Sequence, residues 1–228
     1  IAAETLDEIA TRLEKAKDKN VEVGAIIRDI YKKHNRILFN GNNYSGAWLK
    51  EAAKRGLANT GNCVDSLKAF VTPKALTLFE KYAVLSPKEL HSRYETYVEI
   101  YAKQINIEAM TAIDMARRQY IPAVIEYATF LSDSVASLKS VSLSAPVQED
   151  LLKQVGASLA SVYKNVTKLE GATVRARKIS DTVKQAKAYR DKVFPTIQAL
   201  RVDIDALELL VPADLWPVPT YVDLLFNL

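Results

Sequence analysis

Residues 86–139 decide the fold, and they read SPKELHSRYETYVEIYAKQINIEAMTAIDMARRQYIPAVIEYATFLSDSVASLK without one glycine. Their apolar side chains recur every three or four positions, which places them along one face of an α-helix. Ser86, Pro87 and Glu89 signal the start of this helix, because they supply a capping serine, a first-turn proline and the glutamate of a capping box. Pro122 removes one backbone hydrogen bond and predicts a kink one turn earlier instead of a break. The stretch therefore predicts one helix of roughly 80 Å, too long for a compact domain unless other helices pack along it.

The composition favours a helical protein with little excess charge. Of the 228 residues, 49% are hydrophobic and 25% charged, and only seven are glycine, which favours helix over sheet. The formal net charge is +4, so neither nucleic acid nor a membrane surface is an expected partner. No apolar run reaches the roughly 18 residues of a membrane span. The single cysteine, Cys63, excludes an internal disulfide and suits a reducing, cytoplasmic compartment.

Several short helices are predicted before the long one. The segment 35–44 breaks the helical pattern with asparagines and a glycine, so we expect a structured loop there. Ser45 then caps a helix that Gly56 ends. The chain starts at Ile1 within a helical stripe, as expected of a segment cut from a longer protein. The other short helices are predicted at residues 4–17, 21–33, 62–70 and 72–82.

Two more long helices are predicted after the polar turn at residues 140–146. They run from Ala145 to Lys192 and from Pro195 to Leu210, the second restarted by its proline. Short turns between long helices force antiparallel neighbours. The predicted fold is therefore all-α, a long-helix up-and-down bundle preceded by several short helices. The tail, residues 214–226, is rich in aromatic and aliphatic side chains and is expected to pack as an anchor.

Candidate catalytic and ligand-binding residues are few, and each has a simpler structural explanation. The histidines lack partners at metal-ligand spacing, and the cysteine, which lacks a positioned base, is expected to be buried. The glutamates suit a solvated helix face, and acidic residues interrupt the basic run, which makes a nucleic-acid site less favoured than an exposed face. No catalytic, cofactor-binding or metal-binding residue is therefore assigned. The residues considered are His34, His91, Cys63, Glu95, Glu99, Glu108, Arg175, Arg177, Lys178, Asp181, Lys184, Lys187, Arg190, Asp191 and Lys192.

Four blocks of the sequence resemble type III glutamine synthetases. The first is FNGNNYSGAW at residues 39–48, followed by EAAKRGL at 51–57. The others are LHSRYETYVEIY at 90–101, INIEAMTAIDM at 105–115 continuing to Ala123, and DLWPVPTYVDLLF at 214–226. These blocks span nearly the whole chain in order and match the C-terminal part of that enzyme. The resemblance implies a cytoplasmic, oligomeric parent enzyme that makes glutamine from glutamate and ammonia with ATP and a divalent metal such as Mg²⁺.

The resemblance carries no catalytic residue into this chain. The family's nucleotide, metal and glutamate ligands lie on an upstream β-rich domain, and nothing here resembles their motifs. Residues 1–85 resemble the helical end of the catalytic domain, and residues 86–228 the helical extension typical of type III enzymes. Only the loop Asn40–Ser45 is a candidate for a position near the active site, and a polar turn between helices is the simpler interpretation of it.

Two hypotheses for the function follow. In the first, the chain is a structural part of a glutamine synthetase that supports the upstream catalytic domain and subunit contacts in a homo-oligomer, and is inactive alone. In the second, it is an autonomous helical interaction module without enzymatic activity. A reading frame that continues upstream into catalytic motifs would favour the first hypothesis. The sequence gives neither the oligomer number nor the regulatory ligands.

Overall fold

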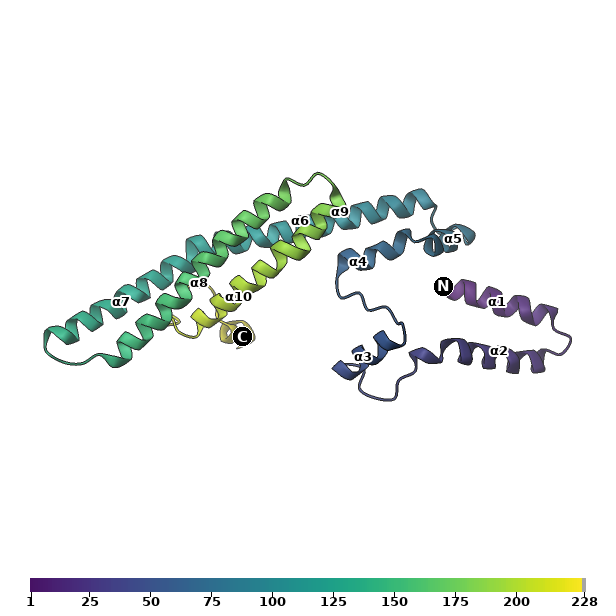
Figure 1. The fold of residues 1–228 in the computed structure, drawn as a ribbon, viewed down its shortest axis with the longest axis horizontal. Helices are drawn as coiled ribbons and strands as arrows, with labels where there is room; N and C mark the ends of the chain where they lie inside the picture. The colour runs from purple at the N-terminus through teal and green to yellow at the C-terminus, as the bar shows by residue number, and fades with distance from the viewer. Residues whose placement is uncertain (227–228) are drawn as a thin grey trace. The chain divides into compact units, whose positions relative to one another are not determined.

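The computed structural model describes residues 1–226, and these residues form helices and connecting turns without a strand (Figure 1). The predicted all-α class is confirmed. The chain divides into two compact units, Ile1–Thr96 and Tyr97–Leu228, which join within the helix α6 (Pro87–Met115).

The first unit consists of short helices and the beginning of α6. The helices are α1 (Ala2–Lys15), α2 (Lys19–His34), α3 (Gly46–Lys54), α4 (Cys63–Leu67) and α5 (Pro73–Lys81), with 3-10 turns at Asn35–Ile37 and Lys68–Val71. α2 to α5 each begin with a side-chain cap, from Asp18, Ser45, Asn62 and Thr72, whereas α1 begins without one. Ser45 accepts a hydrogen bond from the Trp48 backbone N–H, and Gly56 ends α3 with a left-handed φ of 69°. Ser86 and Glu89 form the predicted capping box, with a Ser86 N to Glu89 Oε2 distance of 2.7 Å.

The first unit has a sparse hydrophobic core. α1 and α5 contain no buried residue, although both are amphipathic. The amphipathic sequence pattern favours these two helices. Among the described residues of the unit, however, no layer of side chains buries the apolar faces of α1 and α5. The buried hydrophobic residues of this unit are Ile26, Ala52, Val64, Leu67 and Leu90.

The predicted long helix extends from Pro87 to Ser140. α6 continues into a π-helical turn at Ala116–Tyr120 and then into α7 (Ile121–Ser140). Pro122 lies just after the π-helical turn, which accommodates its missing N–H, so the proline perturbs the helix without breaking it. The predicted apolar stripe is buried at most of its positions, including Val98, Ile105 and Val124.

The second and third long helices complete an up-and-down bundle with α7 (Figure 1). α8 (Pro146–Arg177) reverses the chain, and a further reversal leads into α9 (Thr182–Ala188), a π-helical turn at Tyr189–Val193 and α10 (Phe194–Glu208). α8 packs against α7 on one side and α10 on the other.

Two predicted boundaries in this region are wrong. The helix expected from Ala145 to Lys192 ends at Arg177, because Asp181 caps a new helix by accepting a hydrogen bond from the Lys184 N–H at 2.7 Å. Pro195 does not restart the chain either. The preceding π-helical turn makes room for it, and the Thr196 hydroxyl donates to the Lys192 carbonyl at 2.8 Å.

The bundle is held together by an apolar seam and a few polar contacts. Val155, Val162, Val166 and Leu169 of α8 are fully buried and recur every three, four or seven positions along one face of the helix. At its polar edge Arg117 binds Glu170 in a two-pronged ion pair, at 3.0 Å from Nε and 2.8 Å from Nη2. This ion pair fixes the π-helical turn of the long helix against α8.

The tail contacts the bundle mainly through Trp216. Trp216 is only 6% exposed and stacks at a tilt on Tyr120, with ring centroids 5.1 Å apart. The tail ends in α11 (Tyr221–Phe226), where Leu224, Leu225 and Phe226 are mostly exposed. Trp216 therefore packs as the predicted anchor. The last three apolar residues are exposed on this chain, so their packing stays a prediction, with this chain's helices, the upstream catalytic domain or a neighbouring subunit as the partner. The Tyr221 side chain, part of the same prediction, lies outside the described residues.

Candidate functional site

The loop Asn40–Ser45 is a rigid turn built from its own side chains. Asn42 Oδ1 accepts from the Tyr44 N–H at 2.9 Å, and the Ser45 hydroxyl donates to the Asn42 carbonyl at 2.7 Å. Phe39 stacks on Trp48 beside it, with ring centroids 4.6 Å apart. These contacts leave the Tyr44 side chain 99% exposed. The predicted polar turn between helices is therefore present, and it presents one aromatic ring to its surroundings.

Arg55 secures this loop to α3. Its Nη1 donates to the carbonyls of Leu38 and Arg36, at 2.6 and 3.2 Å, and its Nε lies 2.7 Å from Glu51 Oε1. The guanidinium also lies 5.7 Å from the centre of the Trp48 ring. Arg55 of the block EAAKRGL thus ties the backbone just before the loop to the end of α3.

The histidines and the cysteine singled out in the sequence do not come together as a site. His34 ends α2 and His91 lies on α6, and both are exposed. Cys63 is exposed, so its expected burial is wrong, because Val64 and Leu67 take the inward positions of α4. No group of three His, Cys, Asp or Glu side chains in residues 1–226 is placed to hold a metal ion. These residues do not fit a metal centre.

The glutamates of the long helix have ordinary surface partners. Glu99 forms an ion pair with Lys103 at 2.7 Å, one helical turn away, and Glu108 accepts a hydrogen bond from Gln104 at 3.1 Å. Glu95 is exposed. The prediction of a solvated helix face is confirmed for Glu99 and Glu108.

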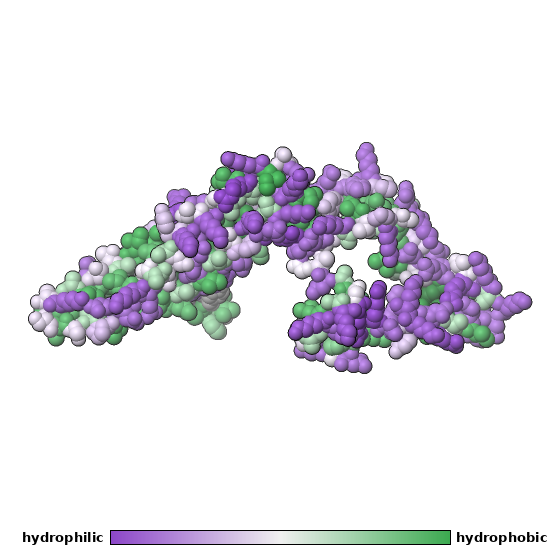
Figure 2. Space-filling model, in the orientation of Figure 1, coloured by the Kyte–Doolittle hydropathy of each residue, from purple (hydrophilic) through white to green (hydrophobic). Residues whose placement is uncertain are grey.

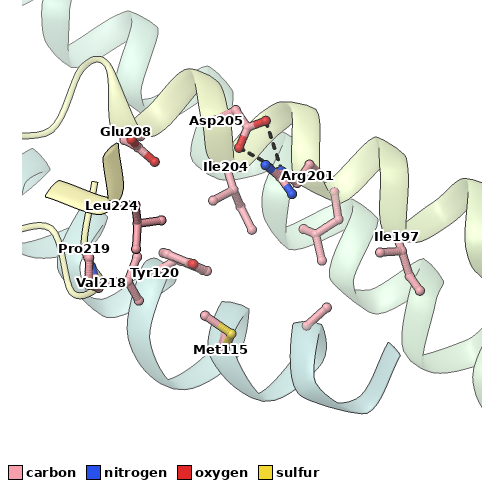
Figure 3. A pocket seen from close by; sticks show the side chains of 12 residues that line it. Met115, Tyr120, Ile197, Arg201, Ile204, Asp205, Glu208, Val218, Pro219 and Leu224 are labelled. Atoms are coloured by element: carbon pink, nitrogen blue, oxygen red, sulfur yellow. Dashed lines mark hydrogen bonds and ion pairs between the residues drawn. The ribbon is translucent and has the colours of Figure 1, made fainter. Parts of the chain in front are cut away.

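A cavity of about 500 Å³ opens between the long helix, α10 and the tail (Figure 3). Its walls are mainly apolar, and Leu224 of α11 lies over it together with Val218 and Pro219. One edge is polar, since Arg201 and Asp205 form an ion pair at 3.2 Å there and Glu208 lies close by (Figure 3). The other lining residues are Ala112, Met115, Tyr120, Ile197, Leu200 and Ile204.

The polar edge of this cavity offers binding and packing but no evident catalysis. Burial raises the pKa of the Tyr120 phenol above its ordinary value, and the nearby Glu208 carboxylate raises this pKa further. The phenol therefore stays protonated at neutral pH. Sequence reasoning missed this cavity, because it forms only where the tail returns to helices about 100 residues earlier. The one local signal was the spacing of Arg201 and Asp205, four positions apart on one helix face.

The surface of the first unit carries many unburied apolar side chains. On α2, Val21, Ile27 and Tyr31 are exposed by 70%, 62% and 62%. Val23, Ile27, Ile30 and Tyr31 recur at helical spacing along one face of α2, and an exposed apolar stripe of this kind is typical of a protein contact. Figure 2 shows apolar residues in green among the hydrophilic ones over the surface of the molecule. Further exposed members are Leu6, Val23, Ile30, Ile37, Leu38, Leu49 and Val84, and we call the whole set the apolar surface of the first unit.

Comparison with known proteins gives the family. The sequence model of the family described as "Glutamine synthetase C-terminal domain" matches residues 22–139, just over half of the chain. This match includes most of α2, the loop Asn40–Ser45 and all but the last residue of the long helix. The chain belongs to the glutamine synthetase C-terminal domain family.

Individual members of the family match over almost all of the chain. A type-3 glutamine synthetase of Dictyostelium discoideum is 32% identical over 218 residues, which cover 93% of this chain. A glutamine synthetase of Butyrivibrio fibrisolvens is 31% identical and covers 91%. One from Bacteroides fragilis is 24% identical and covers 99%. The resemblance to type III glutamine synthetases is thus confirmed.

The chain spans less than a third of the length of these relatives. It corresponds to 30% of the first two glutamine synthetases and 32% of the third. In the part of the chain that the structure describes, no helix is both long and apolar enough to cross a membrane.

Proposed function

We propose that this chain is the C-terminal helical part of a glutamate–ammonia ligase and that its own role is structural. In this role it supports the catalytic domain of the same protein and contributes to the contacts of a homo-oligomer. The exposed apolar side chains of the first unit, above all the stripe on α2, are the observation that carries the proposal, because no described residue covers them.

The energetics of the first unit support this role. α2 buries Ile26 alone, while Val21, Ile27 and Tyr31 stay more than half exposed. Full burial of one such aliphatic or aromatic side chain is worth about 1.5–3 kcal/mol. Because about two thirds of each side chain is still exposed, covering these three would add about 3–6 kcal/mol before ordering costs, a large share of the stability of a small domain. The first unit therefore gains substantial stability when a partner covers α2.

The partner we propose for this surface is the catalytic domain. Residues 1–85 complete its helical end, and residues 86–228 form the extension typical of type III enzymes. The correspondence to about 30% of each relative supports this assignment and disfavours an autonomous interaction module. The compact units divide at Thr96, within α6 and close to the proposed boundary.

The chemistry belongs to the rest of the enzyme in this proposal. ATP, Mg²⁺ and glutamate bind to the catalytic domain, in the cytoplasm, and the chain alone neither makes glutamine nor binds ATP. Calorimetry of the chain with ATP and Mg²⁺ tests this, with no heat of specific binding expected. A stoichiometric, micromolar isotherm would show that the helical part holds a nucleotide site of its own.

A matched pair of variants in the full-length enzyme tests the structural role. Ile27→Gln places a polar amide on the apolar surface, whereas Arg28→Gln makes the same amide at the neighbouring, exposed position. We expect Ile27→Gln to lower the melting temperature and the yield of active enzyme, and Arg28→Gln to change neither. Equal behaviour of both variants would contradict a covered α2.

A further inference from the structure

The end of the bundle around α9 concentrates the positive charge of the chain. Residues 168–192 contain eight basic and three acidic residues, a net charge of +5, while the whole chain carries only +4. The rest of the chain is therefore close to neutral. Such a local excess attracts anions in a way that the overall composition conceals.

Within this region a groove of about 400 Å³ runs between α8 and the helix formed by α9, its π-helical turn and α10. The floor is made of small side chains, Ala172, Ala176 and Ala188. These methyl groups let a bound molecule come close to both helices. The volume falls within the range of small-molecule sites, roughly 300–1,000 Å³. We call this site the basic groove.

Three cations stand at the rim of the basic groove, and no carboxylate lines it. They are Lys168 and Arg175, two helical turns apart on α8, and Lys192 from the π-helical turn. All three are exposed, and none of them forms an ion pair within the described residues. Arg117 of the same bundle, by contrast, is neutralised by Glu170. The three rim cations keep their charge available for a ligand.

The position of Arg175 depends on a glycine. A Cβ atom at Gly171 would lie 3.2 Å from Arg175 Nη1, so the absent side chain lets the guanidinium lie back along α8. The guanidinium thus lies beside Gly171 at the groove, while the side chain as a whole stays exposed.

We propose that the basic groove binds a small organic phosphate with an apolar body. A phosphate dianion neutralises more of the positive charge of the three cations than a single carboxylate does. The planar guanidinium of Arg175 can donate two parallel hydrogen bonds to phosphate oxygens. The apolar body lies on the three alanines. An inorganic ion would leave this floor uncovered, and a neutral apolar molecule would leave the cations unpaired. Only a molecule with both a phosphate group and an apolar body contacts both the cations and the alanines.

Calorimetry of the full chain in a phosphate-free buffer tests the proposal with three probes of related structure. These are hexyl phosphate, inorganic phosphate and 1-hexanol. We expect hexyl phosphate to bind at least tenfold more tightly than either of the others, and more weakly as salt is added. Equal binding of hexyl phosphate and inorganic phosphate would overturn the proposal and leave only diffuse attraction of anions. Absence of hexyl phosphate binding at millimolar concentration would also overturn it.

Variants separate the rim from the floor. Lys192→Gln should weaken hexyl phosphate binding at least fivefold, whereas the control Lys164→Gln, an exposed lysine on α8 that does not line the groove, should not. Ala188→Leu fills the floor and should weaken hexyl phosphate but not inorganic phosphate. Circular dichroism confirms that each variant is folded, and Lys192→Gln carries the test if Ala188→Leu is not. Equal losses in Lys192→Gln and Lys164→Gln would contradict a specific groove, and tighter binding of an acidic peptide than of hexyl phosphate would replace the small molecule with a protein partner.

Discussion

Replacing Trp216 with alanine should uncouple the tail from the bundle. The indole is 94% buried, given its 6% exposure, and stacks on Tyr120. Truncation of a buried tryptophan to alanine usually costs about 3–5 kcal/mol, because apolar contacts are lost and a cavity remains. For a bundle of this size such a loss lowers the melting temperature by about 10 °C or more.

Trp216→Phe provides the matched control. The indole Nε1 is buried without a hydrogen-bond partner, and an unsatisfied buried donor costs about 1–3 kcal/mol. Phenylalanine keeps the ring contact with Tyr120 and removes this donor. The loss of ring volume and the relief of the donor oppose each other, so we expect Trp216→Phe to cost less than about 2 kcal/mol.

Thermal unfolding followed by far-ultraviolet circular dichroism compares the two variants with the unaltered chain. A Trp48→Phe background leaves Trp216 as the single tryptophan, and its emission should be that of a buried indole until the bundle unfolds. Two results would refute the reasoning. One is a Trp216→Ala variant as stable as the unaltered chain, and the other is a Trp216→Phe variant as damaged as Trp216→Ala.

Three further predictions concern single contacts. Arg117 lowers the pKa of Glu170 by hydrogen bonding, so above the ordinary pKa of 4.5 this ion pair stabilises the chain by about 1 kcal/mol, and the stabilisation is lost as the pH falls through the lower pKa of the folded state. The difference in unfolding free energy between the unaltered chain and Glu170→Gln, measured by urea unfolding, should therefore disappear in acid, and a difference that is independent of pH would contradict the ion pair. Asn106 accepts a hydrogen bond from the buried Tyr189 hydroxyl at 3.0 Å, so Asn106→Ala should lower the free energy of unfolding by about 1–3 kcal/mol, and by clearly less in a Tyr189→Phe background. Additive losses in the double variant would contradict this hydrogen bond. Gly56→Ala should cost about 1 kcal/mol in thermal unfolding because φ is 69° there, and an unchanged melting temperature would show that the left-handed turn relaxes freely.

Local signals predicted the long helix and its ends well. Ser86, Pro87 and Glu89 act within one turn of each other, so neighbouring residues suffice to place the start. Pro122 also behaves as expected, since a perturbed but continuous helix is a local response to a missing N–H. Ser45 and Gly56 are predictable for the same reason.

The errors fall where distant residues decide the structure. The sequence after Arg177 contains no glycine or proline before Pro195, and only the cap at Asp181 reveals that the helix ends. Cys63 was expected inside, yet Val64 and Leu67 fill the inward positions of its short helix. The cavity under the tail depends on contacts across about 100 residues, which no local pattern encodes.

Hydrogen exchange of the first unit tests the central proposal most directly. The backbone amides of α2 are compared between this chain alone and the full-length enzyme, with the amides of α8 as the internal reference. We expect the backbone amides of α2 to exchange much more slowly in the full-length enzyme, whereas the amides of α8, which is already packed in the bundle, should change little. Equal exchange of α2 in both proteins would contradict a role in which the catalytic domain covers the apolar surface of the first unit.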